Sequence, residues 1–325
     1  MKRREFIGAT AAGAPLTALA GAPAGSRNDE TAAAVVVERP LAGRPHAGKV
    51  LLAIQPHADD IPLFAAGTVA KLLDEGYTGH LVRVTNDDMA GPGTVGETVL
   101  ANEKDNDEVA RVLGLQRVFN LNYNNHWMDG VSRPELRLRF IFLIRLLKVD
   151  TVVGYDPWGH YEENPDHYVT AQCVAACWMA GRGKDYPEHF AAGLEPHAVR
   201  EKYYFARGPQ LVNRVVDIGA TIDRKVEANL ANLAQGPAGR AGERLRATLA
   251  GRQLKLPVLG DDDATANRQY VKEFVLRANG ELGRRHGLEY AEAFHHVGPN
   301  ALGIGYSREE MDEYVRRHAV PVESR

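Results

Sequence analysis

The sequence predicts an α/β protein with a Rossmann-like, doubly wound and mainly parallel sheet that carries helices on both faces. Short, continuous apolar runs such as residues 49–54 recur along the chain, which is typical of strands buried on both faces. These runs alternate with helix-length stretches, two of which end at Gly76 and Gly114, and glycine commonly ends helices. Strands that alternate with helices in this way favour parallel pairing through right-handed crossovers.

The composition indicates one large globular domain. The chain has 325 residues, of which 44% are hydrophobic and 25% are charged, so it is neither a disordered tail protein nor a multi-span membrane protein. A formal net charge of -3 gives no electrostatic case for binding nucleic acid. The two cysteines, Cys173 and Cys177, lie four apart in a predicted helix. We interpret them as buried structural cysteines rather than an oxidised pair or a thiolate metal site.

The first 25 residues resemble a twin-arginine-type signal peptide. Arg3 and Arg4 precede an Ala/Gly-rich apolar stretch, and small residues follow where a signal peptidase would cleave. The glycines and prolines of this stretch make a stable membrane-spanning helix improbable. We therefore expect export to the periplasm or the exterior and no stable membrane insertion; an ordinary disordered basic terminus is the alternative. Residues 26–48 are predicted to be a linker.

The strands and helices can be assigned in order along the chain. Strands are predicted at 49–54, 79–85, 118–121 and 151–155, and helices at 62–75, 97–113, 137–147 and 168–179. Further on, 235–251 is predicted to be a surface excursion or mobile lid, and 267–282 a final helix. Polar clusters follow each of the four strands. Because ligands bind at the carboxyl ends of the strands in such sheets, we expect the functional site there.

The polar cluster after the first strand predicts a metal site. His57, Asp59 and Asp60 crowd into four residues, and packed carboxylates repel one another unless a cation lies between them. His57 and one of the two aspartates are suitable zinc ligands, and the other aspartate could act as general base toward water. His167, which follows the fourth strand, is the best candidate for a third ligand. The alternative is that Asp59 and Asp60 only cap a helix and that His57 is a loop histidine.

The sequence lacks the motifs of two other kinds of site, a nucleotide-binding loop and a nucleophilic serine. The first strand is followed by neither of the glycine patterns G-x-G-x-x-G and G-x-x-x-x-G-K-[ST], so a nucleotide cradle is not predicted. No G-x-S-x-G sequence occurs, so the motif that usually surrounds a nucleophilic serine is absent.

These residues resemble the two signatures of the PIG-L (LmbE-like) deacetylases. The first is 56–60 with the strand before it, and the second is 165–167. Weaker matches occur at 85–91, 109–114, 155–157, 216–218, 223–225 and 291–294. The resemblance implies a PIG-L/LmbE-like domain over 49–300, followed by a C-terminal extension over 301–325. Members of this family are zinc-dependent enzymes that remove acetyl groups from N-acetylglucosamine-type sugars.

The resemblance also implies roles for individual residues. His57, Asp60 and His167 would bind zinc, and Asp59 would be the general base. Asp166 would tune the basic groups nearby, as an outer-shell partner. Tyr161 could polarise the amide carbonyl and stabilise the oxyanion.

Four positions depart from the family pattern. Ile61 replaces a Glu, Asn164 replaces the first His of the second signature, and Asn102 and Asn125 replace an Arg and an Asp. The first two changes remove neither a ligand nor the base. The last two remove charges that family members use to hold substrate, so we expect a different substrate.

A second group of polar and aromatic side chains is expected near the pocket mouth. The candidate substrate-binding residues are Asn125, His126, His160 and Asn164. Amides, imidazoles and nearby tryptophan rings suit a neutral carbohydrate, although an asparagine-rich turn is an equal alternative for 122–125.

Together these features predict an exported zinc amidohydrolase that removes an N-acetyl group from an amino-sugar-containing substrate. Two alternatives stay open: a carbohydrate-binding protein of the same fold that has lost catalysis, and a hydrolase for another amide conjugate or an ester. The same ligand set also accepts iron, cobalt or manganese. The expected partner is a small-molecule or glycan substrate, and the sequence sets no oligomeric state.

Overall fold

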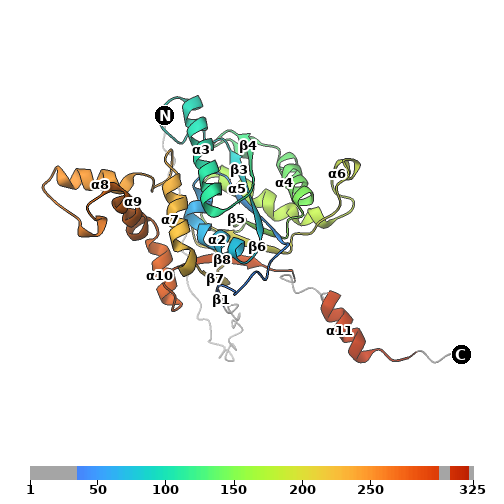
Figure 1. Ribbon diagram of the computed structural model, residues 1–325. Helices are drawn as coiled ribbons and strands as arrows, with labels where there is room; N and C mark the ends of the chain where they lie inside the picture. Colours follow the sequence, from blue (N-terminus) through green and yellow to red (C-terminus); the bar gives the residue numbers. More distant parts are fainter. Residues whose placement is uncertain (1–34, 300–307, 322–325) are drawn as a thin grey trace, which may run out of the picture. The chain divides into compact units, whose positions relative to one another are not determined.

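An eight-stranded sheet organises the chain in the computed structural model, which describes residues 35–299 and 308–321 (Figure 1). The strand order is β1-β7-β8-β6-β5-β2-β3-β4. β8 runs antiparallel to both of its neighbours, β6 and β7, and the remaining pairs are parallel. The strands are β1 Val36–Glu38, β2 Val50–Gln55, β3 Thr78–Thr85, β4 Val118–Tyr123, β5 Thr151–Tyr155, β6 Glu201–Phe205, β7 Arg214–Asp217 and β8 Ala291–Val297. The predicted α/β class with a mainly parallel sheet is confirmed.

Helices cover both faces of this sheet. Along β2, Leu51 and Ala53 belong to one hydrophobic core and Leu52 and Ile54 to the other, because successive side chains of a strand point to opposite faces. The first core includes residues of α2 Ala66–Asp74, α3 Val95–Leu113 and α7 Ile222–Ala231, and the second includes residues of α4 Arg133–Leu147 and α5 Pro165–Ala175. Figure 1 shows α3 and α7 on one side of the sheet and α4 on the other.

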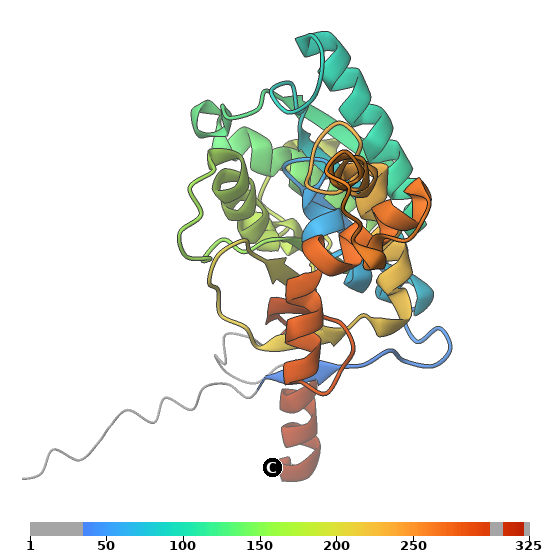
Figure 2. The same ribbon diagram turned by 90° about the vertical axis from the view of Figure 1, so that its left-hand side faces the viewer.

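The remaining helices are short or peripheral. They are α1 Asp60–Phe64, α6 Pro187–Ala191, α8 Ala241–Ala250, α9 Asp263–Tyr270, α10 Arg277–Arg285 and α11 Arg308–His318. α8 packs against α9, and α9 against α7, as Figures 1 and 2 show; Figure 2 gives the view turned by 90°. Within the ranges that the structure describes, no helix is long and apolar enough to cross a bilayer.

Three predicted segments differ from the structure. Part of the predicted linker over 26–48, Val36–Glu38, is strand β1, which pairs with β7. The Glu38 carboxylate holds it there, because it lies 2.8 Å from Lys71 Nζ and accepts a 3.0 Å hydrogen bond from the Tyr203 hydroxyl. These partners are distant in sequence, so no local pattern could reveal them.

The predicted final helix over 267–282 is interrupted, and it is not the last helix. A π-helical turn, Val271–Val275, separates α9 from α10, and α11 follows later. The Leu276 amide donates to the Val271 carbonyl, five residues back, at 2.8 Å. This wider turn brings Val271 and Leu276 into the same core. The predicted excursion over 235–251 contains helix α8. The predicted signal peptide, residues 1–25, lies outside the described residues.

Candidate metal centre and catalytic site

The turn after β2 is held by hydrogen bonds between its own side chains and backbone. Gln55 Oε1 accepts from the Ile61 amide at 2.9 Å, and Asp60 Oδ2 accepts from the His57 amide at 2.8 Å. A third bond joins the turn to the end of β3, where Asp87 Oδ2 accepts from the Ala58 amide at 3.2 Å. These bonds fold the turn back so that β2 passes directly into α1. The imidazole of His57 and the carboxylate of Asp60 are thereby fixed at the carboxyl edge of the sheet.

The three predicted metal ligands meet at this edge. His57, Asp60 and His167 each offer a ligand atom, and these atoms lie within 4.8 Å of one another. His57 Nδ1 is 2.9 Å from His167 Nε2, and the Asp60 oxygens are 3.6 and 3.7 Å from those two nitrogens. All three side chains are buried. Residues that are 110 positions apart in the sequence thus form one compact donor set.

In each of the two imidazoles, the nitrogen that faces away from the other ring lies beside a carboxylate. Asp166 Oδ2 is 3.0 Å from His57 Nε2, and Glu162 Oε1 is 3.1 Å from His167 Nδ1. Each carboxylate holds a ring proton on its own side, so the nitrogens that face each other are the ones available to a metal. Without a metal, one of these two nitrogens carries a proton and donates it to the other across 2.9 Å, and a divalent cation would take the place of that proton. This donor set therefore fits a divalent metal, with the carboxylate–histidine pairs that orient metal ligands.

The electrostatics of the site follow from these contacts. Burial lowers the pKa of His57, but the hydrogen bond to Asp166 and the charges of Asp60 and Asp87 outweigh it and raise this pKa to about 9. Burial raises the pKa of Glu162, but hydrogen bonds with His167 and an arginine outweigh it and lower this pKa to about 2. A carboxylate with so low a pKa stays ionised beside His167 at any physiological pH.

Asp59 stands at the edge of the metal cluster with a free carboxylate. It occupies the position before α1, yet its side chain accepts no capping hydrogen bond from the described residues. The alternative that this aspartate serves only as a helix cap is therefore not supported. Partial burial and the neighbouring Asp60 carboxylate raise the pKa of Asp59 to about 7. A carboxyl group with a pKa near neutrality is well matched to proton transfer.

Tyr155, at the end of β5, supports two of the ligands. Its hydroxyl donates a 2.8 Å hydrogen bond to Asp60 Oδ1, and its ring stacks on that of His167 with centroids 4.3 Å apart. This tyrosine ends the predicted fourth strand, and no sequence motif marks it as a site residue.

The cluster opens into a cavity of about 260 Å³. Of the predicted site residues, the ligands, Asp59, Asn125, His126 and Asn164 line it. Asn164 also caps α5, because its side chain accepts from the Asp166 amide at 2.9 Å. Asn125 is 2% exposed, and its Oδ1 has no hydrogen-bond partner in the described part of the chain. That oxygen is closed off from solvent behind the cavity surface.

The other predicted site residues, Asp166, Tyr161 and His160, do not line the cavity. Asp166 is fully buried behind His57 and also accepts from the His126 amide at 2.7 Å. Tyr161 and His160 are not among the described residues that line the cavity. The side chain of Tyr161 is 86% exposed, so the structure does not bring the predicted oxyanion donor to the metal cluster.

Comparison with known proteins agrees with this geometry. Residues 52–178, which contain all three ligands and Asp59, match the family model described as PIG-L: GlcNAc-PI de-N-acetylase. The family resemblance predicted from the sequence is thus confirmed over this part of the chain. A diacetylchitobiose deacetylase from Thermococcus kodakarensis is 27% identical over 194 residues, which cover 58% of this chain and 71% of that protein.

Solved structures share the fold over most of the chain. The N,N'-diacetylchitobiose deacetylase of Pyrococcus horikoshii superposes with a TM-score of 0.62 at 23% identity, covering 80% of this chain and 88% of that one. A 4-carboxy-2-hydroxymuconate hydratase from Pseudomonas putida KT2440 has a TM-score of 0.54 at 16% identity, covering 77% and 97%. Because these two enzymes catalyse different reactions, the PIG-L/LmbE-like fold alone does not determine the reaction.

The departures from the PIG-L pattern have structural explanations. Ile61 is fully buried in the core beside β2. Asn102 is also fully buried, and its amide donates to the Ala90 carbonyl at 2.9 Å and the Thr98 carbonyl at 3.0 Å. Its side chain thus fixes the loop after β3 and does not line the cavity.

Two further residues that line the cavity carry no sequence signal. Arg207, in the loop after β6, lines the cavity and lies 3.1 Å from Glu162 through its Nε. Gln235, in the segment after α7, also lines the cavity. Both lie outside the matched residues 52–178, in loops without a recognisable motif, so only the folded chain reveals them.

Proposed function

We propose that this protein is an exported, metal-dependent N-deacetylase that removes an acetyl group from an amino-sugar-containing substrate, with zinc as its metal. The observation that carries the proposal is the set of His57, Asp60 and His167 ligand atoms within 4.8 Å of one another, beside an aspartate with no capping role. The PIG-L match over this region and the similar diacetylchitobiose deacetylase support the reaction and the substrate class.

Different residues of the site orient the metal ligands and transfer the proton. A bound divalent cation supplies the Lewis acidity that makes water nucleophilic near neutral pH and polarises an acyl oxygen. Asp59 accepts the proton from the attacking water and afterwards delivers it to the departing amine. Asp166 and Glu162 hold the two imidazoles in the orientation and tautomer that the metal requires.

Other groups of the cavity hold the substrate. Asn125 lines the cavity, and a side-chain amide can form hydrogen bonds with the acetamido group or a hydroxyl of a sugar. Arg207 and His126 can donate to its oxygens from the cavity wall. Because Tyr161 is 86% exposed, we assign no oxyanion contact to it in this arrangement.

Release of free amine from a panel of N-acetylated sugars tests the proposal. The wild-type protein should release amine, and a metal chelator should abolish the release until zinc is restored. The variant Asp59→Asn should keep its metal and lose about 10²–10⁴-fold in turnover, the usual contribution of a general base, whereas His57→Ala should lose both metal and turnover. Glycan binding without amine release, unaffected by chelator, would indicate a binding protein instead and refute the deacetylase.

Export is a separate part of the proposal. It rests on the paired Arg3 and Arg4 before an apolar stretch. Changing both to lysine should keep the protein in the cytoplasm of a host that has the twin-arginine pathway, as cell fractionation would show. Unchanged export of this variant would contradict the proposed route while leaving the proposed reaction untouched.

A further inference from the structure

The proposed general base, Asp59, is not held by a cap of its own helix. Its side chain accepts no capping hydrogen bond at the start of α1 from the described residues. A general base works only within hydrogen-bond reach of the proton it accepts, at ~2.6–3.2 Å, so a carboxylate that turns away loses its function. The position of the Asp59 side chain therefore depends on what packs against it.

The backbone of Gly236 packs directly against this side chain. A Cβ at position 236 would lie 3.3 Å from Cβ of Asp59 and 3.4 Å from its Oδ2, which is closer than the ~3.5–4.0 Å of ordinary van der Waals contact. Gly236 also has a φ of +85°, a conformation that glycine adopts without steric cost. Glycine at 236 therefore suits both the backbone and the carboxylate beside it.

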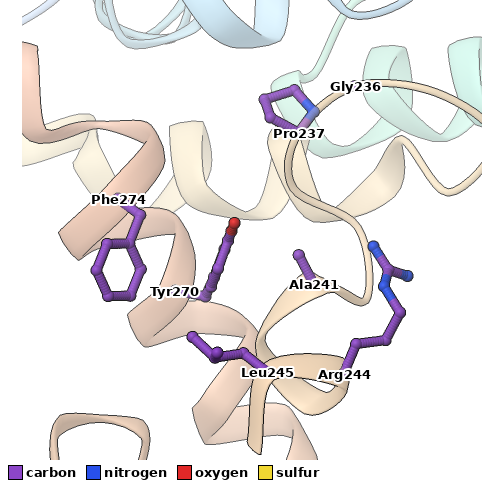
Figure 3. A pocket seen from close by; sticks show the side chains of 7 residues that line it. All are labelled: Gly236, Pro237, Ala241, Arg244, Leu245, Tyr270 and Phe274. Atoms are coloured by element: carbon purple, nitrogen blue, oxygen red, sulfur yellow. The ribbon is translucent and has the colours of Figure 1, made fainter. Parts of the chain in front are cut away.

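On its other side, Gly236 borders a surface hollow of about 510 Å³. The lining of this hollow is shown in Figure 3 and consists of Gly236, Pro237, Ala241, Arg244, Leu245, Tyr270 and Phe274. The backbone at Gly236 thus stands between Asp59 and the hollow. Pro237 stiffens the backbone at this point, because proline has a fixed φ and restricts the residue before it.

The segment that carries Gly236 is fastened to α3. A single oxygen of the buried Asp105, Oδ2, accepts from the amides of Leu233 and Ala234, both at 2.7 Å. Hydrogen bonds to a charged acceptor are among the strong ones. These two bonds therefore fix the residues that lead into Gly236, at the start of the segment predicted to be a surface excursion or mobile lid.

The residue between them, Gln235, connects the segment to the backbone beside Asp59. Its Nε2 donates to Asn102 Oδ1 on α3 at 2.9 Å, and the same side chain interacts with the Asp87 carboxylate. Asp87 Oδ2 accepts from the amide of Ala58, the residue before Asp59, at 3.2 Å. The segment thus meets the proposed base on two sides, at its side chain and, through Asp87, at its backbone.

We propose that residues 233–236 form a positioning segment for the general base, in which Asp105 sets the place of the segment and the Gly236 backbone sets the place of the Asp59 carboxylate. The inference rests on the proposed deacetylase function and adds to it a requirement outside the reacting groups. Asp105 and Gly236 are positioning residues, because they act through Asp59. The segment itself lies beyond the matched residues 52–178.

The variant Gly236→Ala tests the contact directly. The added Cβ should displace the carboxylate by a few tenths of an ångström. Because a misplacement of about 1 Å can cost about 100-fold in rate, kcat should fall about 3–10-fold, whereas KM and bound zinc should stay within about twofold of wild type. A loss in KM alone would overturn the positioning segment.

Gly193→Ala is the matched control. Gly193 has a φ of +83°, and a Cβ there would meet nothing within 4 Å, so this variant has the same backbone strain without the contact. Its kcat should stay within about twofold of wild type. Equal losses of kcat in the two variants would show that backbone strain alone lowers activity and would overturn the positioning segment.

Variants of Asp105 test the anchor. Asp105→Ala leaves the amides of Leu233 and Ala234 without their acceptor, so kcat should fall about tenfold with little change in KM. Asp105→Asn keeps an acceptor oxygen and should retain kcat within about threefold of wild type. Assays run well below the melting temperature of each variant exclude loss of the fold. Wild-type kcat in Asp105→Ala would contradict the assigned anchor.

Combination with Asp59→Asn separates positioning from every other effect of the segment. If the segment acts through the base, Gly236→Ala should change the residual turnover of Asp59→Asn by less than about twofold. A loss as large as in the wild-type background would show that the segment acts on something else, such as substrate binding, and would overturn the proposal.

Crystal structures separate failure of this inference from failure of the proposed function. In zinc-loaded Gly236→Ala the Asp59 carboxylate should be displaced from its wild-type position, while His57, Asp60 and His167 stay in place. An undisplaced carboxylate would overturn the positioning segment even if the wild-type protein deacetylates sugars. Absence of amine release from every acetylated sugar by the wild type would instead refute the deacetylase, and the structures would still decide whether the segment positions Asp59.

Discussion

The carboxylate of Asp166 controls how many protons leave when the metal binds. It lies 3.0 Å from His57 Nε2, and its hydrogen bond helps raise the pKa of His57 to about 9 despite burial. A metal at His57 Nδ1 has to displace the proton that occupies this atom below that pKa. Because the pKa is raised, metal affinity is reduced by proton competition below about pH 9 and recovers as the pH rises through that value.

The variant Asp166→Asn keeps the shape of the side chain and removes its charge. The pKa of His57 should then fall toward its ordinary value of about 6.5. At pH 7, binding should release about one proton per metal from His57 of the wild type and about 0.2 from that of the variant. Between pH 7 and 8.5 the metal affinity of the wild type should rise about 20-fold more than that of the variant. Above the range of proton competition the variant should bind about 10–100-fold more weakly, because it lacks the outer-shell carboxylate.

Calorimetric titration of zinc in two buffers of different ionisation enthalpy measures the protons released. Asp59, whose pKa is about 7, is present in both proteins, so the comparison between them isolates His57. Asp156→Asn is a matched control, because Asp156 is a buried aspartate 3.3 Å from a different histidine, His295. Equal proton release by wild type and Asp166→Asn at pH 7 would refute the assigned role of Asp166.

Two further predictions concern buried groups away from the metal. The Lys225 ammonium lies 2.7 Å from the Glu292 carboxylate, and both side chains are fully buried. Lys225→Met should therefore lower the free energy of unfolding in urea by about 3–5 kcal/mol, because it leaves a buried charge unpaired; a loss below about 1 kcal/mol would contradict this account. Burial raises the pKa of Cys173 to about 11 and that of Cys177 further, so a thiol reagent at pH 8 should react with neither cysteine in the native protein and with both in urea. Rapid reaction before unfolding would show that the thiols are accessible.

The sequence predicts the chemical part of this protein better than the part that recognises substrate. The strands that precede His57, Asp60 and His167 are short apolar runs followed by polar clusters, and a parallel sheet necessarily brings the ends of neighbouring strands together. β2 and β5 are such neighbours, so the metal cluster follows from the pattern. Tyr161, which was predicted as a possible oxyanion donor, is 86% exposed and does not line the cavity, because its sequence position near His167 does not determine where its side chain points.

The site residues that the sequence did not predict were missed for one physical reason. Arg207 and Gln235 reach the cavity from loops whose course depends on tertiary contacts. For Gln235 the decisive contact is the buried Asp105, which is more than a hundred positions away. In the same way β1 depends on ion pairs of Glu38, and the break between α9 and α10 depends on the core that Val271 and Leu276 enter. Helix and strand propensities depend on the local sequence and therefore do not reveal such long-range contacts.

This division predicts how substitutions should affect activity. His57, Asp59 and Asp60 lie in the turn after β2, and His167 lies in the first turn of α5, so changes there should alter the chemistry of every substrate. Gln235 belongs to the segment after α7, which hydrogen bonds to Asp105 and Asn102 hold against α3. Changes to the Gln235 side chain should alter which substrate fits while leaving the metal in place, because that side chain does not contribute to the ligand set.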